Sequence, residues 1–308
     1  MKASEYRRQL DAELQRSATR KAASAKASER AEPAADLLAD VTNRRFGAKR
    51  RIDAIVRAGA TAVKRPRLMN ALILIVAEPT EDGEVRRAAL SAIEASSFKT
   101  VEFRRYAPDY NAALRVAATD DDADLRAEAL DVLALHQDSY AQQLLVDGLT
   151  DPAQALVPPV QAVRMLGYDL HAEHYPLLRE VVATSKQQPL RRAALRLLAA
   201  DSGSRPLMRT IATDKTEDKQ CRATAAVALQ VLAPRDFDRV ARTVVLDDDE
   251  DDDLRATVIT AITHGPTAPG RDVERKVRQI DAAPGGSRQL NRAAREFTTA
   301  RSTRRTRP

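Results

Sequence analysis

The 308-residue chain has no tryptophan, a single cysteine and only 4% aromatic residues. One cysteine, Cys221, excludes an internal disulfide and favours a reducing compartment, so we expect a cytoplasmic protein. With so few aromatic residues, a core has to come from alanine, leucine and valine. Small core residues of this kind suit helices that pack close together.

No hydrophobic run approaches the roughly 20 residues that a membrane-spanning helix needs. The longest run, Leu68 to Ala77, is far shorter and contains Asn70. Charged residues, among them Arg7 and Asp11, occupy the N-terminal positions where a signal peptide would be apolar. We therefore expect neither a membrane span nor secretion.

A short pattern recurs along the chain at a nearly constant spacing. It consists of an apolar residue, an arginine, two spacers, a small central residue and a further apolar residue four positions on. The arginines are Arg86, Arg126, Arg191, Arg222 and Arg255, and the central residues are Ala89, Ala129, Ala162, Ala194, Ala225 and Val258. Repeats of about 30 to 40 residues with helical spacing predict stacked helical hairpins.

Each hairpin is expected to contain a first helix, a polar loop and a second helix that carries the pattern. Weaker hairpins near 36–64 and 271–300 are expected to cap the two ends. The first helices are predicted near 68–78, 108–118, 138–148, 173–184, 204–213 and 236–246. A hairpin of this kind cannot bury its wide apolar stripe alone, so neighbouring hairpins must stack.

These residues resemble the HEAT-repeat family, within the armadillo-like solenoids that include the HEAT-like repeats of bilin lyases. The resemblance covers about 34–300 and implies an all-α solenoid of about seven to eight stacked helical hairpins in a right-handed superhelix. It also implies that the pattern arginines and the loop acids form ladders between successive repeats. In one repeat Pro159 replaces the arginine and follows Pro158, so that second helix should be shortened or kinked.

The net charge of +6 is unevenly distributed. Basic ends flank an acidic body, which would attract polyanions or acidic proteins to the ends and basic partners to the body. Solubility and attraction between ends and body are an equal alternative. We divide the chain into a basic segment rich in Ala, Ser, Lys and Arg (1–33, partly helical or disordered), a solenoid (34–300) and a disordered arginine-rich tail (301–308).

Seven consecutive acidic residues precede the second helix of one repeat: Asp247, Asp248, Asp249, Glu250, Asp251, Asp252 and Asp253. Aspartate at this place caps free amides and opposes the helix dipole. We favour helix capping and a solvated acidic ridge, with docking of a basic partner as the second interpretation. A calcium site is disfavoured, because the run lacks the spacing and the glycine of a calcium loop.

Arginines also occupy outward positions of the second helices. Arg192 and Arg196 lie one turn apart, and Arg164 and Arg87 hold related positions in earlier repeats. We treat these four as candidate partner-binding residues, against the alternative of an ordinary charged face. Candidate polyanion-binding residues lie near the C-terminus: Arg301, Arg304, Arg305 and Arg307.

Motifs that carry catalysis are missing. His171 and His174 lie three residues apart, but no second cluster of ligands accompanies them. Cys221 stands at an apolar position of the pattern and is expected in the core. There is no Walker loop or dinucleotide motif, no His-Glu motif of the HEAT-repeat iron hydroxylases, and no basic aromatic cleft as in the HEAT-like alkylpurine DNA glycosylases. We predict no enzymatic activity, no cofactor and no metal.

The leading hypothesis is a scaffold that binds protein partners along an extended solenoid surface. The second is nucleic-acid binding through the basic termini and the outward arginines, which the acidic body and the scarcity of aromatic residues disfavour. An accessory role like that of bilin-attaching solenoids is the third. The oligomeric state is left open, and the irregular end hairpins make self-association through an end a hypothesis.

Overall fold

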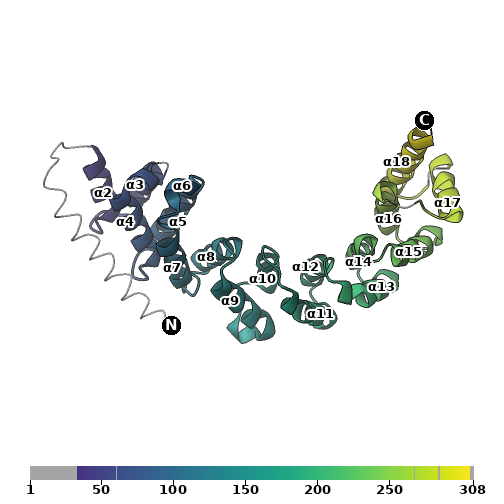
Figure 1. The fold of residues 1–308 in the computed structure, drawn as a ribbon, viewed down its shortest axis with the longest axis horizontal. Helices are drawn as coiled ribbons and strands as arrows, with labels where there is room; N and C mark the ends of the chain where they lie inside the picture. The colour runs from purple at the N-terminus through teal and green to yellow at the C-terminus, as the bar shows by residue number, and fades with distance from the viewer. Residues whose placement is uncertain (1–32, 60, 267, 284, 306–308) are drawn as a thin grey trace. The chain divides into compact units, whose positions relative to one another are not determined.

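The computed structural model describes residues 33–59, 61–266, 268–283 and 285–305 (Figure 1). These residues form 17 α-helices and contain no strand, so the predicted all-α class is confirmed. The chain divides after Pro158 into two compact units, unit 1 and unit 2. Each unit is a stack of helical hairpins.

In unit 1, three hairpins follow one another as the pairs α2/α3, α4/α5 and α7/α8. The insertion expected between the first two pattern repeats forms the short helix α6, whose Phe103 is buried. The helices are α2 (Pro33–Thr42), α3 (Ala48–Gly59), α4 (Pro66–Ala77), α5 (Gly83–Ser97), α6 (Thr100–Phe103), α7 (Ala107–Ala117), α8 (Ala123–Leu135) and α9 (Ser139–Thr150).

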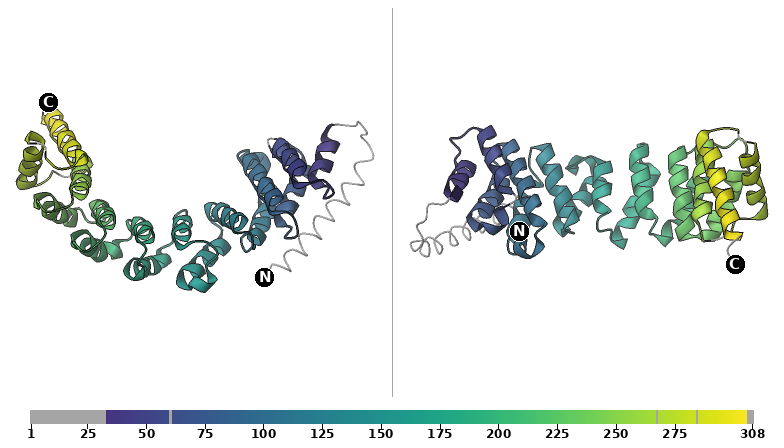
Figure 2. Two further views of the ribbon diagram at one scale, coloured as in Figure 1. Left: turned by 180° about the vertical axis from the view of Figure 1, so that it is seen from behind. Right: turned by 90° about the horizontal axis from the view of Figure 1, so that it is seen from above.

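Unit 2 begins with α10 and continues with four hairpins, α11/α12 to α17/α18. The second helices α12, α14, α16 and α18 pack side by side in one layer, and α13, α15 and α17 form the other (Figures 1 and 2). The helices are α10 (Pro159–Leu166), α11 (Tyr175–Thr184), α12 (Gln188–Leu198), α13 (Arg205–Thr213), α14 (Lys219–Leu232), α15 (Pro234–Leu246), α16 (Asp252–His264), α17 (Arg271–Ala282) and α18 (Arg288–Arg305).

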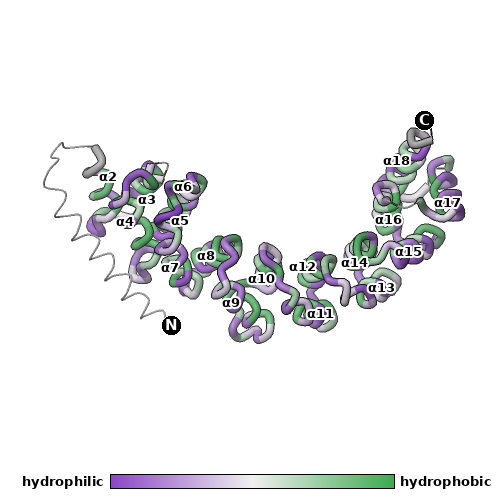
Figure 3. Tube along the Cα trace, viewed as in Figure 1, coloured by the Kyte–Doolittle hydropathy of each residue, from purple (hydrophilic) through white to green (hydrophobic). Residues whose placement is uncertain are grey.

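The central residues of the repeated pattern form the core, as predicted. All six are buried, with no more than 3% of their surface exposed. Hydrophobic and hydrophilic residues alternate around the helices at helical spacing (Figure 3). Helix α10 begins at Pro159 and contains 8 residues, fewer than the other second helices, so the shortening expected from the two prolines is confirmed.

In the acidic loops, two adjacent residues have different structural roles. The aspartate caps the second helix: Asp82, Asp122, Asp218 and Asp251 each accept backbone hydrogen bonds from the residues two and three positions ahead. In three of these loops a glutamate directly precedes the cap and binds the arginine of the preceding repeat; these glutamates are Glu81, Glu217 and Glu250. In these three repeats, a Glu-Asp pair before the second helix therefore accompanies the link to the preceding repeat.

The pattern arginine connects three segments of the chain. Arg222 donates through Nε to the carbonyl oxygen of Ala212, at the end of the first helix of its own hairpin (3.4 Å). Its two terminal nitrogens bind the carboxylate oxygens of Glu250 at 2.9 and 2.6 Å. The guanidinium thus satisfies an orphan helix carbonyl and an acid of the next repeat at once.

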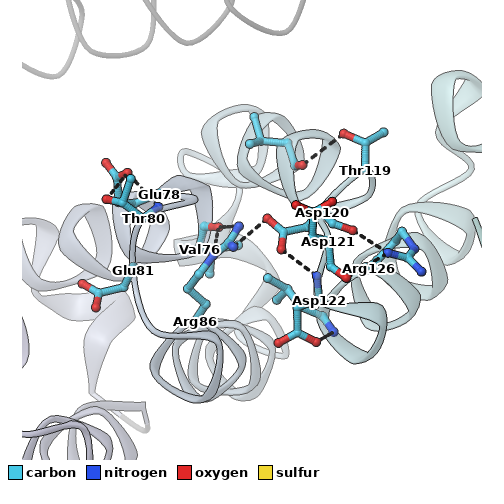
Figure 4. A network of polar contacts seen from close by, with 12 residues as sticks. Val76, Glu78, Thr80, Glu81, Arg86, Thr119, Asp120, Asp121, Asp122 and Arg126 are labelled. Carbon is cyan, nitrogen blue, oxygen red and sulfur yellow. Dashed lines mark hydrogen bonds and ion pairs between the residues drawn. The ribbon is translucent and has the colours of Figure 1, made fainter.

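The same arrangement recurs in both units, which confirms the inter-repeat ladder. Arg86 binds the carbonyl of Val76 and the carboxylate of Asp120 at 2.6 Å (Figure 4). Arg191 binds the Val182 carbonyl and Glu217. The ladder also includes Arg51, which binds Val41 and Glu81 and lies in a hairpin that we expected only as a weak cap.

Two pattern arginines depart from the ladder. Arg126 has no carboxylate partner among the described residues and instead donates to the carbonyls of Leu156 and Asp120. Arg255 turns back to its own loop, where Asp248 and Asp252 lie at 3.3 and 3.7 Å.

The ends of the chain differ from the predicted boundaries. Helix α18 continues to Arg305, so residues 301–305, predicted to be a disordered tail, are helical. Residues 1–32 and 306–308 lie outside the described part, and the domain limits and the handedness of the superhelix stay predictions. Within the described ranges, no helix combines the length and apolarity that crossing a bilayer requires.

The buried ladder predicts a large cost for breaking one pair. Glu250→Gln leaves the Arg222 guanidinium, 4% exposed, without its counterion, and we expect unit 2 to lose about 3–5 kcal/mol of unfolding free energy. Urea denaturation followed by circular dichroism measures this. Asp249→Asn, an exposed neighbour, is the matched control and should change stability by less than about 0.5 kcal/mol. Equal losses in the two variants would contradict a structural ladder.

Acid should weaken the ladder. Hydrogen bonds from Arg51 hold the pKa of Glu81 below its ordinary value of 4.5, against the opposing effect of burial. Although burial opposes it there too, hydrogen bonds from Arg222 and the Asp251 amide lower the pKa of Glu250. A lowered carboxylate pKa stabilises the fold above the unfolded-state value and loses that contribution as pH falls through the folded-state value. We therefore expect unfolding free energy to decline below about pH 4.5, with a shallower decline in Glu81→Gln.

Candidate functional site

The second helices of unit 2 form a grooved surface. A first groove of about 400 Å³ lies between α12, α14 and α16. A second groove of about 450 Å³ lies between α14, α16 and α18. The two share Val227 and Thr257, so we treat them as one continuous feature, the inner groove. It crosses four consecutive second helices of the same layer.

The floor of the inner groove is apolar and partly exposed. Val227 and Val231 lie one helical turn apart on α14, with 40% and 79% of their surface exposed. The small residues Ala199, Ala223 and Ala261 line the groove on either side. Their size leaves room above the backbone, which is how a flat helix layer becomes a groove. Exposed apolar residues that gather at such a surface mark interaction sites.

Polar groups border this floor. Arg196 stands at the α12 side and is exposed, whereas Arg292 and Glu296 form an ion pair at 2.8 Å on α18. Gln230 donates from its amide nitrogen to the carbonyl oxygen of Ala261 at 2.6 Å, tying α14 to α16 within the groove. The α12 side of the inner groove therefore carries the net positive charge.

The structure separates the four arginines predicted to bind a partner. Arg164 is exposed on α10, Arg192 is half-buried on α12, and Arg196 lines the inner groove; α10 and α12 pack together. Arg87 belongs to unit 1, where it pairs with the helix cap Asp122 at 2.7 Å. Arg87 therefore joins successive repeats, whereas Arg196 lines the inner groove.

The acidic run 247–253 is largely engaged within the chain. Asp247 pairs with Lys215 at 2.5 Å, Asp248 with Lys276 and Arg255, and Glu250 with Arg222. The remaining contacts are those of Asp251 as helix cap, of Asp252 with the Ser287 amide, and of Asp251 and Asp253 with Lys219. Of the seven side chains of this run, only that of Asp249 forms no ion pair or hydrogen bond with the described residues. These contacts fit the capping interpretation and leave little unpaired charge for a basic partner.

The structure describes some of the four C-terminal arginines that were predicted to bind a polyanion. The guanidinium of Arg301 lies over the ring of Phe297, 5.5 Å from its centroid, and so packs on α18. The backbone of Arg304 and Arg305 belongs to α18, whereas Arg307 lies outside the described residues. Binding of a polyanion by these four arginines stays a prediction.

The remaining candidates for chemistry were two histidines and the single cysteine. The rings of His171 and His174 lie 5.9 Å apart, and the described ranges contain no group of three or more His, Cys, Asp or Glu side chains placed to hold a metal ion. Cys221 is fully buried, and burial raises the pKa of its thiol to about 12, so it stays protonated at neutral pH. Its sulfur donates to the Gln188 side chain at 3.3 Å, consistent with the predicted core position.

Sequence reasoning missed Val227 and Val231, although the pattern contained a signal. The position two residues after the central residue faces outward in every second helix. In the other repeats it carries Ser91, Asp131, Arg164, Arg196 or Thr260, and in α14 alone among these repeats it carries a large apolar residue, Val227. An alignment of the repeats by their central residue would therefore have singled out α14 among the six pattern repeats, together with α3, where Val56 holds the same position after Ala54.

Comparison with known proteins identifies no family. No family model matches the chain, and no curated protein matches it. Among solved structures, human deoxyhypusine hydroxylase in complex with glycerol is similar, with 14% identity and a TM-score of 0.34. The match covers 80% of this chain and 99% of that one.

This match corrects one prediction. From the missing motifs we predicted that the chain is not an enzyme, whereas the similar solved protein is itself an enzyme. A stack of helical hairpins is compatible with catalysis, and the prediction is withdrawn. At this TM-score and identity, the likeness transfers no activity, substrate or site. The conclusion that stands is an all-helical repeat protein.

Proposed function

We propose that the chain is a HEAT-repeat protein that binds a protein partner through the inner groove of unit 2. The observation that carries this proposal is the continuous groove with Val227 and Val231 exposed on its floor. Fully burying one valine side chain contributes about 1.5–3 kcal/mol, so two valines supply a substantial part of a micromolar affinity. The single, buried cysteine supports a cytoplasmic location.

The geometry favours an amphipathic helix as the bound segment. Val227 and Val231 present a stripe one turn long, which an apolar pair at helical spacing on the partner matches. The small alanines beside them allow close approach of a second backbone. Arg196 at the border then selects a partner with a carboxylate beside its apolar stripe, since opposite charges at the rim steer association and set its register.

Removing the apolar floor should weaken binding. The double substitution Val227→Ser and Val231→Ser is expected to lower the affinity of an amphipathic leucine/glutamate helix by about tenfold or more, because the partner loses its main buried contact. Fluorescence anisotropy with a labelled synthetic peptide measures this. Both residues are exposed, so thermal unfolding should change little.

The matched control is Val56→Ser, which alters a valine of similar exposure (67%) on α3 in unit 1. It should leave the affinity unchanged. Arg196→Glu should weaken binding and Arg196→Lys should largely preserve it. If the serine variants bind the peptide as tightly as the parent, or if a DNA duplex binds with the same dependence on the two valines, the proposal fails.

A further inference from the structure

Unit 1 contains a group of carboxylates on the face formed by α5 and α8. Glu94 lies on α5, and Glu128 and Asp131 lie on α8; we call these three residues the acidic cluster. The charges of Glu128 and Asp131 repel the negative charge of the Glu94 carboxylate. The hydroxyl of Ser91 donates to Glu128 at 3.4 Å, so the side chains of the two helices meet here. The acidic cluster is separate from the inner groove, which belongs to unit 2.

No cation balances the two glutamates. Within the described ranges, neither Glu94 nor Glu128 forms an ion pair. Arg87 acts on Glu128 electrostatically, but it is itself paired with Asp122 at 2.7 Å. Desolvation, followed by repulsion from Glu128 and Asp131, raises the pKa of Glu94 to about 7. Desolvation likewise raises the pKa of Glu128, opposed by Ser91 and Arg87 and reinforced by Asp124.

A buried hydroxyl lies beside the acidic cluster without a partner. Tyr110 of α7 is 1% exposed, and its hydroxyl makes no hydrogen bond to the described residues. Its ring contacts Phe103 and His136 edge to face. Burial and then the charges of Glu94 and Glu128 raise the pKa of the phenol, so both carboxylates lie near it. A buried hydroxyl without a hydrogen bond is costly, so a polar partner near Tyr110 would stabilise this part of unit 1.

Exposed apolar side chains adjoin the acidic cluster. Phe98 follows Glu94 by one helical turn and is 85% exposed, and Leu135 follows Asp131 by one turn and is 64% exposed. The face therefore presents carboxylates and, one turn further along both helices, hydrophobic groups. A segment complementary to this face would carry a basic residue and, one helical turn away, an apolar residue.

We propose that this face binds a basic amphipathic segment of a protein partner, with a lysine ammonium between Glu94 and Glu128 and apolar side chains on Phe98 and Leu135. An ammonium carries three donors and no acceptor, which suits two neighbouring carboxylates. It would hold both glutamates ionised. The site goes beyond the proposed function, since it uses another unit and the opposite charge.

The test uses the full chain and a labelled synthetic peptide that places lysine and leucine at helical spacing. We expect Glu94→Gln with Glu128→Gln to reduce its affinity by about tenfold, measured by fluorescence anisotropy at pH 8. In the parent chain the affinity should fall severalfold between pH 8 and pH 6, because Glu94 takes up a proton and no longer attracts the ammonium. Glu94→Gln should abolish that dependence.

Controls separate this site from general attraction. Glu84→Gln removes an exposed carboxylate from the first turn of α5 and should leave the affinity unchanged. The Val227→Ser, Val231→Ser variant should still bind the lysine peptide, so the two proposals fail independently. An unchanged affinity in the double glutamine variant overturns the proposal. The proposal is also overturned if calcium displaces the peptide more strongly than sodium does at the same ionic strength. If the double variant does not fold, a parent affinity that is flat between pH 6 and pH 8 overturns it.

Discussion

The pattern arginine is the interaction on which the stack depends. A hairpin of two short helices leaves carbonyl groups without partners at the end of its first helix, and these groups lie against the next loop. Arg222 satisfies one of them at Ala212 and binds Glu250 in the same plane, so a single side chain closes its own hairpin and joins it to the next. The planar guanidinium presents its donors in a fixed fork that reaches both partners, whereas a lysine ammonium is a single compact charge. The apolar stripe drives the stacking, and the arginine fixes its register.

The ladder also accounts for where the chain divides. Arg126 is the last pattern arginine of unit 1, and it finds only carbonyl partners among the described residues. In the next repeat Pro159 takes the place of the arginine and opens the 8-residue helix α10. The unit boundary falls directly before this proline. Losing the ladder acid and then the ladder arginine in consecutive repeats removes the cross-link that Arg51, Arg86, Arg191 and Arg222 form elsewhere.

Most of the fold could be predicted from the sequence, because the repeated pattern shows which face of each second helix is buried and which residues link successive repeats. The first helices, the buried central residues and the arginine–acid pairing follow from it. Arg51 was missed because Arg50 stands where the pattern expects an apolar residue, although its contacts with Val41 and Glu81 follow the same rule. The extension of α18 to Arg305 was missed because composition alone predicts disorder for an arginine-rich end. The surroundings of Glu94 could not be predicted from the sequence for another reason. Its perturbed pKa arises from desolvation and from carboxylates some 35 residues away in the sequence.

The candidate sites follow from the positions that the ladder leaves unconstrained. The central residue, the arginine three positions before it and the cap seven positions before it are all committed to packing, capping or cross-linking. The outward position two residues after the centre is committed to none of these, and its chemistry changes from Asp131 on α8 to Arg196 on α12 and Val227 on α14. Because this position lies on the same layer in each repeat, a change of side chain alters the surface without altering the stack. A repeat protein of this design can therefore acquire an acidic face in one unit and an apolar, positively bordered groove in the other, while arginines of the same pattern link repeats within each unit.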